Sequence, residues 1–222
     1  MRHSVRALVV IALTLGASPA RAQNPGLPVY NIGVPRGIGI YGDVAFPNDA
    51  AHGGTAYGAT ARAGFGLFGA TATLSSLNPD GPGGSDVSVG GTLNYRLLGG
   101  PLVPLSVTLQ GGVSYAKPDE GIAPGGDVTA YRFPVGVGFA LVIPNPVLAI
   151  HPWLAPRLDI GYRKSGSTSN TDTNFGLSGG LELNFLNGFG VQAAYDRVFV
   201  KDVPDASTFG IGAHYSFRVP GL

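Results

Sequence analysis

Cysteine is absent from the 222 residues, and charged residues are scarce. Without cysteine, disulfides cannot stabilise the chain as they do in small secreted scaffolds. Asp, Glu, Lys and Arg make up 12% of the residues, which is about half the usual fraction in soluble domains. The formal net charge is +1, and this balance argues against nucleic acid as a partner. The scarcity of charge indicates that part of the surface meets a medium other than water.

Long hydrophobic runs are also missing, apart from one short run at the start. Residues 1–22 begin with arginines ahead of an apolar run of about ten residues and end in Ala-Arg-Ala. A membrane helix needs about 18 or more apolar residues, so this run indicates a secretory signal peptide cleaved near Ala22. A short buried helix is the alternative. Because this segment holds three of the 14 Lys and Arg and none of the 13 Asp and Glu, the exported chain has a side-chain charge of −2.

Glycine is abundant, with 36 residues, and it falls mostly at alternate positions within apolar runs. The stretch "YRFPVGVGFAL", residues 131–141, shows the pattern: every second residue is large and apolar, and those between are Arg, Pro, Gly, Gly and Ala. Strict alternation predicts a strand whose two faces meet different surroundings. No Gly-X-Y period exists, which excludes collagen, and no helical period of useful length is present. The exported chain is therefore expected to be all-β.

Ten candidate strands follow from this alternation. They cover residues 36–46, 55–65, 68–76, 86–97, 104–116, 129–142, 147–163, 173–185, 189–198 and 207–218. Most exceed the five or six residues typical of globular sheets and suit a tilted bilayer crossing of about 9 to 11 residues. Prolines within the strands, at Pro134, Pro152 and Pro156, predict bulges or bends.

The connections between these strands alternate between long polar loops, among them "KSGSTSNTD", and tight turns. Long loops at one end and short turns at the other are typical of outer-membrane barrels whose termini both lie in the periplasm. We predict a closed antiparallel up-and-down transmembrane β-barrel of about ten strands over residues 36–222. Eight strands remain possible, because 147–163 and the pair around Gly66 could be divided differently. Residues 23–35 are expected to be a periplasmic lead-in.

Outward-facing aromatic residues gather at both ends of the predicted strands, with aliphatic residues between. Those toward the loops are Phe46, Tyr57, Tyr115, Tyr131, Tyr162, Phe175, Tyr195 and Phe209, and those toward the turns are Phe65, Phe68, Tyr95, Phe185, Phe189, Tyr215 and Phe217. Two aromatic girdles around an aliphatic band are typical of a barrel in a membrane. A soluble lipocalin-like barrel is the competing architecture.

The last strand, "FGIGAHYSFRV", contains Gly212-x-x-Tyr215-x-Phe217. This motif resembles the C-terminal signal by which the barrel-insertion machinery recognises outer-membrane proteins. It departs from the usual form at Gly210, where a polar residue is common, and in the five residues that follow Phe217. The exported chain as a whole resembles the small Gram-negative outer-membrane barrels of the OmpA-domain, OmpX and opacity-protein group, a porin-like superfamily. The resemblance implies location in the cell outer membrane and leaves the activity open.

The inward face of the predicted barrel carries eight charged residues. They are Asp43, Arg62, Arg96, Arg132, Arg157, Asp159, Glu182 and Asp196, four of each sign. By height, Arg132 and Arg157 are expected near Asp43, Asp159 and Asp196 in the loop-side half, and Arg62 and Arg96 near Glu182, His151 and His214 in the turn-side half. Buried charges are normally paired, so a charge network that fills the lumen is predicted. The alternative is a narrow water-filled passage lined by the same charges.

Enzyme chemistry and metal binding find little support in the sequence. His151 and His214 have no carboxylate or cysteine at a diagnostic metal-site spacing, and the only rim histidine is His52. The omptin proteases, which are ten-stranded barrels, place their acids and a histidine at the extracellular rim. We expect no catalysis, metal or cofactor.

The favoured interpretation is therefore a non-catalytic barrel with a structural or surface-interaction role through its five extracellular loops, the alternative being a porin-like channel for ions or small solutes. Its expected partners are outer-membrane lipid, lipopolysaccharide and the insertion machinery, and it is expected to be a monomer.

Overall fold

The computed structural model describes residues 24–35, 37–80, 84–100, 103–117 and 128–217. The signal peptide expected over residues 1–22 lies outside these ranges. The elements are β1 (Gly37–Pro47), the 3-10 helix η1 (Asp49–Ala51), β2 (Thr55–Phe65), β3 (Phe68–Asn78), β4 (Asp86–Gly100), β5 (Val103–Lys117), β6 (Val128–Leu141), β7 (Ile143–Pro144), β8 (Leu148–Ser165), β9 (Thr168–Phe185), β10 (Phe189–Phe199) and β11 (Ala206–Phe217). No helix among the described residues is long and apolar enough to cross a membrane.

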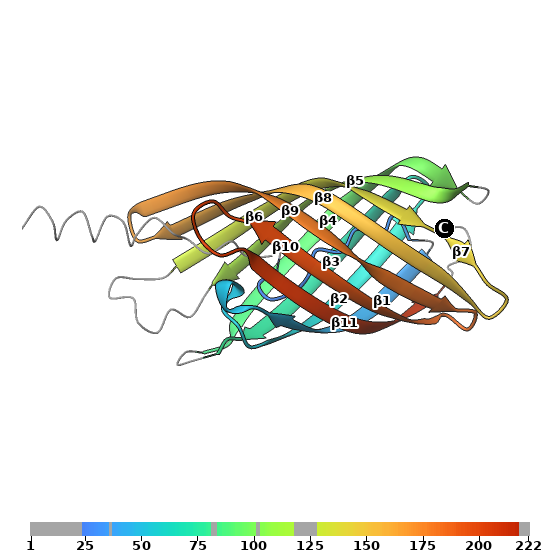
Figure 1. Ribbon diagram of the computed structural model, residues 1–222, viewed down its shortest axis with the longest axis horizontal. Helices are drawn as coiled ribbons and strands as arrows, with labels where there is room; N and C mark the ends of the chain where they lie inside the picture. Colours follow the sequence, from blue (N-terminus) through green and yellow to red (C-terminus); the bar gives the residue numbers. More distant parts are fainter. Residues whose placement is uncertain (1–23, 36, 81–83, 101–102, 118–127, 218–222) are drawn as a thin grey trace, which may run out of the picture.

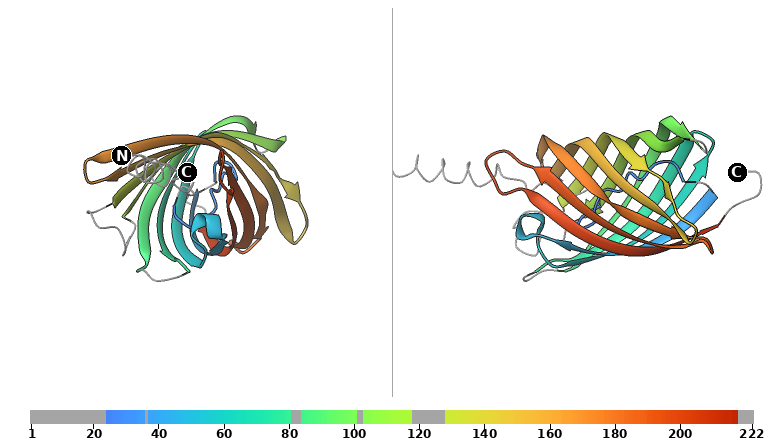
Figure 2. Two further views of the ribbon diagram at one scale, coloured as in Figure 1. Left: turned by 60° about the vertical axis from the view of Figure 1, so that its left-hand side comes forward. Right: turned by 45° about the vertical axis from the view of Figure 1, so that its right-hand side comes forward.

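Ten of these strands close into one antiparallel barrel (Figures 1 and 2). Each strand pairs with its neighbours in chain order, β1 also pairs with β11, and β8 pairs with both β6 and β9. The two-residue β7 pairs only with the start of β8 in the described residues. The prediction of a closed up-and-down barrel with ten strands is confirmed.

The two ends of the barrel differ in their connections. At one end, here called the turn end, residues 66–67, 101–102, 142–147 and 186–188 join the strands. At the other, the loop end, the connections are residues 48–54, 79–85, 118–127, 166–167 and 200–205. In the orientation expected from the sequence, the loop end is extracellular and the turn end periplasmic.

The connection between β8 and β9 is shorter than expected. Most of "KSGSTSNTD" belongs to the strands, which pair up to Ser165↔Thr168 across a two-residue turn. Its threonines favour extended backbone, so the ladder continues where a loop was predicted. The resulting hairpin extends past Phe175, where the pairing of β9 with β10 ends, while on its other side β8 stays paired with β6 up to Val128↔Ser165; it reaches far out at the loop end (Figure 1).

The prolines interrupt the ladder without shifting its register, so of the bulges or bends expected there, the bulges are wrong. Pairing of β5 with β6 skips the residues opposite Phe133 and Pro134, and the pairs on either side keep one register. The register shifts occur instead in the β4–β5 pair, around Leu98, next to Gly99, whose φ is +111°. Proline removes one ladder donor but keeps an extended backbone, so losing a hydrogen bond does not require an extra residue.

The exterior is apolar and the interior polar, the reverse of a soluble domain. Leu93 is 73% exposed and Phe65 63% exposed on the outer face, whereas Asp159 and Ser178 inside are fully buried. The predicted girdle residues meet across strands: Tyr115, Tyr131 and Tyr162 form a row at the loop end, and Phe189 packs edge-on to Tyr215 at the turn end. This distribution is that of a barrel surrounded by lipid.

Residues 24–35, here called the lumenal segment, do not form a periplasmic lead-in. They run inside the barrel, where Asn24, Leu27, Val29 and Asn31 are each less than 5% exposed (Figure 2). The sequence contains three prolines and no alternating pattern here, so the segment cannot join the sheet as a strand. Three of its backbone groups bond to side chains of the lumen wall instead.

Candidate functional site in the barrel lumen

The loop-side half of the lumen holds a chain of ion pairs across three strands. Arg132 of β6 donates to Asp159 of β8 at 2.9 Å from Nε and 2.5 Å from Nη2. Arg157 donates to the other oxygen of Asp159 at 3.2 Å and to Asp196 of β10 at 2.8 Å. All four side chains are at most 6% exposed. Two arginine forks thus bridge two carboxylates, as expected for charges kept out of water.

Asp43, which the sequence placed with this group, has uncharged partners. Its Oδ1 accepts a hydrogen bond from Gln192 Nε2 at 2.6 Å and from the Tyr30 hydroxyl at 3.0 Å. The carboxylate also lies against Gly212 of β11, where a Cβ atom would collide with it. Tyr30 therefore links the lumenal segment to the β1 wall.

The turn-side half contains a second group around Arg62. Its Nη1 lies 3.9 Å from Glu182 Oε2, and its guanidinium carbon lies 3.9 Å from the ring centre of Tyr41 and 5.2 Å from that of Tyr30. A guanidinium between aromatic faces is stabilised by the ring quadrupoles, particularly where water is excluded. Arg62 therefore lies beside Glu182, as predicted, and Tyr30 and Tyr41, which the prediction did not include, lie against its guanidinium group.

The two histidines join this group through an asparagine. Asn184 donates to Glu182 at 2.7 Å and approaches His151 Nδ1 at 3.3 Å. His214 Nε2 lies 2.9 Å from Asn184 Oδ1, and the His214 ring stacks on Tyr41 at 4.4 Å. The histidines thus belong to a hydrogen-bonded network. Within the described residues, no three His, Cys, Asp or Glu side chains gather in a way that could hold a metal ion.

Arg96 and Gln110 hold the lumenal segment by its carbonyl oxygens. Arg96, expected beside Glu182, donates to the Val34 carbonyl at 3.0 Å. Gln110 donates to the Tyr30 carbonyl at 2.9 Å and bonds Asn94 at the same distance. On the opposite side, the Val29 N–H donates to Asp196 at 2.8 Å. The wall therefore satisfies three backbone groups of a segment that has no strand partner.

The lumenal segment runs along the barrel axis from the loop-end half to the turn end. Near its tip, Leu27 packs with Ala45, Ala56 and Leu77, which lie at the loop ends of β1, β2 and β3. In the middle, the Tyr30 ring lies 6.0 Å from that of Trp153. At its base, Pro35 lies against Gly64 of β2. The segment therefore contacts the wall near its tip, in its middle and at its base.

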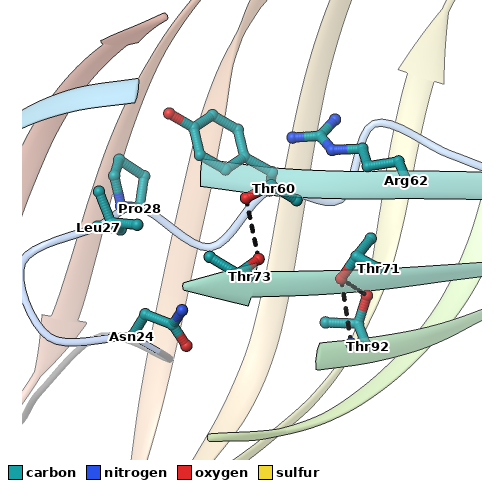
Figure 3. A pocket seen from close by; sticks show the side chains of 9 residues that line it. Asn24, Leu27, Pro28, Thr60, Arg62, Thr71, Thr73 and Thr92 are labelled. Carbon is teal, nitrogen blue, oxygen red and sulfur yellow. Dashed lines mark hydrogen bonds between the residues drawn. The ribbon is translucent and has the colours of Figure 1, made fainter. Parts of the chain in front are cut away.

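Hydroxyl groups line the wall of β2, β3 and β4 beside the lumenal segment (Figure 3). Thr60 bonds Thr73 and Thr71 bonds Thr92, both at 2.9 Å. Between these threonines and the segment lies a cavity of about 30 Å³, which Asn24 and Arg62 also line. One water needs roughly 10–15 Å³ of such space, so the cavity has room for about two.

Sequence reasoning missed Tyr30, Tyr41, Asn184 and Gln192 as lumen residues. A signal for three of them existed, because side chains an even number of residues apart on a strand share a face. Tyr41 is two residues from Asp43, Asn184 two residues from Glu182, and Gln192 four residues from Asp196. Tyr30 had no such signal, since it lies outside the strands.

The apolar exterior, the aromatic girdles and the buried charges inside together define a transmembrane β-barrel. The chain belongs to the outer membrane protein beta-barrel domain family, whose model matches residues 8–217. This membership places the protein in the outer membrane, as predicted.

Solved structures with the same fold include the beta domain of the Bordetella autotransporter BrkA, with 13% identity, coverage of 81% of this chain and 98% of that one, and a TM-score of 0.51. Ail of Yersinia pestis matches at 18% identity over 82% of this chain and 100% of that one, with a TM-score of 0.39. The N-terminal barrel of Pseudomonas aeruginosa OprF matches at 12% identity over 81% and 96%, with a TM-score of 0.38. No curated protein sequence matches the chain.

Proposed function

We propose that this protein is a non-catalytic outer-membrane barrel, closed to solutes, that acts through the surface at its loop end. One observation supports the proposal: ion pairs along one side of the wall and the lumenal segment beside them both take up space in the bore. Arg132, Arg157, Asp159 and Asp196 occupy the β6–β10 side of the loop-side half, and Tyr30 lies between Trp153 and Asp43 below them. A filled lumen leaves the loops as the parts that can meet the exterior.

The absence of catalysis is part of this proposal and is supported by how the lumen acids are used. Asp159 and Asp196 accept hydrogen bonds from arginines, and Asp43 from Gln192 and Tyr30. A general base needs a carboxylate or imidazole within reach of a substrate proton. These carboxylates are instead buried and accept hydrogen bonds from neighbouring lumen side chains.

Lipid and lipopolysaccharide contact and insertion through the C-terminal strand complete the proposal. Tyr215 and Phe217 of β11 face outward and are 43% and 39% exposed. Side chains that contact the insertion machinery or lipid must be exposed in this way. Gly212 has a second role in the fold, since it makes room for Asp43. We expect the folded barrel to be a monomer.

A narrow channel is the second candidate function. The hydroxyl-lined wall of β2 to β4, which borders the cavity, favours it. The ion pairs of the loop-side half lie on β6, β8 and β10, on other strands than this polar wall. The lumen charges balance, four against four, so such a channel would discriminate weakly between cations and anions.

Single-channel conductance of the refolded protein in a planar bilayer tests both candidates. A gel shift between unboiled and boiled samples confirms that the barrel has formed. The proposal predicts folded protein without steady conductance, and it also predicts that the barrel tolerates replacement of its loops. Steady conductance that Arg132→Ala or Arg157→Ala alters would replace it with the channel.

A further inference from the structure

The lumenal segment contacts the wall as a bound peptide does. Three of its hydrogen bonds involve its own backbone: the Val29 N–H to Asp196, and the carbonyls of Tyr30 and Val34 with Gln110 and Arg96. Side-chain anchors add to these, with Leu27 in an apolar pocket and Tyr30 bonded to Asp43. Backbone bonds combined with alternate side-chain pockets are how proteins bind extended peptides.

The wall is shaped around this segment. A Cβ atom built on Gly138 would lie 2.5 Å from Asn31 Cγ, and one on Gly58 would lie 2.5 Å from Leu27 Cδ1. Further wall glycines that face the segment in the same way are Gly64, Gly69, Gly90 and Gly210. The small side chains of the inward faces thus form a groove whose shape matches a peptide.

The wall does not depend on the lumenal segment for charge neutrality. Residues 24–35 contain no charged side chain, and the ion pairs of Arg132, Arg157 and Arg62 all join one wall strand to another or lie within one strand. Removing the segment would cost hydrogen bonds, among them the one from Tyr30 to Asp43, and packing, but it would take no counter-charge away from these ion pairs. Loss of a counter-charge is the change that destabilises a buried ion pair most.

The base of the segment can bend and its tip is incompletely bonded. Gly33 and Gly37 flank the base with φ of +111° and +86°, a region that glycine enters freely. At the tip, Asn24 is 3% exposed, and neither polar atom of its side-chain amide has a hydrogen-bond partner among the described residues. The tip borders the 30 Å³ cavity (Figure 3). A buried amide without partners lowers the cost of withdrawing this end.

We propose that the lumen is a binding site for an extended, uncharged peptide, and that residues 24–35 are its removable occupant in the same chain. The segment leaves by bending at Gly33, near its base, and at Gly37, where β1 begins. A second peptide of the same chemistry can then take its place. This inference concerns occupancy of the site and does not depend on whether the lumen conducts.

Thiol labelling of the full mature chain tests the exchange, because the protein has no cysteine of its own. Asn31→Cys places a thiol on the segment, and Thr108→Cys places a control thiol on the β5 wall. The two positions are equally hidden, at 2% and 1% exposure. The reagent is a maleimide on a polymer too large to enter the barrel, and a gel shift confirms that both variants are folded. A removable segment predicts labelling at Asn31→Cys about tenfold or more faster than at Thr108→Cys, since local opening costs less than global unfolding.

Added peptide tests the site itself. A synthetic peptide of residues 24–35, at concentrations above the roughly millimolar effective concentration of a tethered segment, should accelerate labelling of Asn31→Cys. A scrambled peptide of the same composition should not. Equal labelling rates at the two positions would overturn the proposal, and Ile32→Cys checks that result at a second place on the segment. Fast labelling that ignores the peptide would overturn the binding site and leave only a flexible segment.

Discussion

Arg157 joins the two buried carboxylates of the loop-side network, and its replacement by methionine should be the most damaging change in the lumen. It donates to Asp159 and to Asp196, and it is 4% exposed. Without it Asp159 keeps Arg132, but Asp196 keeps only the Val29 N–H among the bonds described above. Removing one partner of a buried ion pair costs about 3–5 kcal/mol. We expect Arg157→Met to lower the free energy of unfolding by that amount.

Urea unfolding of the refolded barrel in lipid vesicles measures this loss. Trp153, the single tryptophan, is 5% exposed inside the lumen, so its emission reports the loss of lumen packing. Arg197→Met is the matched control, because Arg197 pairs with Asp205 at the exposed rim. Exposed pairs contribute little to stability, and a much smaller loss is expected there.

A double variant separates lost charge pairing from lost packing. Arg157→Met combined with Asp196→Asn removes the arginine and the carboxylate it leaves behind, so it should be more stable than Arg157→Met alone. If Arg157→Met loses no more stability than Arg197→Met, or if the double variant is the less stable, the network does not hold the lumen together in the way described.

The remaining predictions concern the lumenal segment, the β11 wall and the rim. Leu27→Ala should lower the free energy of unfolding by about 2–5 kcal/mol, because the segment stays docked until the barrel unfolds, and a loss near zero by the same urea assay would contradict its packing. Gly212→Val should expel Asp43 from its place and reduce the fraction that shows the folded gel shift, whereas Gly212→Ser should do so less. Asp205 accepts from the Val200 N–H and from Arg197, and these bonds lower the pKa of its carboxyl. The stability that these bonds supply is therefore present above the unfolded pKa and is lost as pH falls through the folded pKa. Carbon-detected NMR titration should show a higher pKa for Asp205 in Arg197→Ala than in the unchanged protein. An unchanged pKa would refute the role assigned to Arg197.

Strand positions and faces could be predicted because they follow from a local rule. In "YRFPVGVGFAL" the period of two assigns Arg132 to the lumen whatever the rest of the chain does. Hairpin pairing then sets relative heights, which is why Arg132, Arg157, Asp159 and Asp196 were correctly expected in one group. The extra length of the β8–β9 hairpin was missed because polar Thr and Ser residues read equally well as loop or as strand above a membrane.

Partners across the bore could not be predicted in the same way. Asp43 bonds Gln192 on β10 and Tyr30 from the lumenal segment, and Arg96 reaches a backbone carbonyl of that segment. Which side chains meet depends on the tilt of the strands and on the stagger at which β1 meets β11. It also depends on the lumenal segment, which lies in the bore, and the pairing register of the hairpins does not predict where that segment lies.

By itself, the sequence determined a closed barrel of about ten strands, with eight still possible, that has an apolar, girdled exterior and charges inside, because alternation, turn residues and strand length act over a few neighbouring residues. Only the tertiary structure decided that residues 24–35 lie within the lumen. That segment has no periodicity and no charge to place it, and its position results from glycines, carboxylates and amides that meet only once the barrel has closed. The small residues beside the arginine of "YRFPVGVGFAL" thus have a physical reason: at Gly138 they leave room for Asn31.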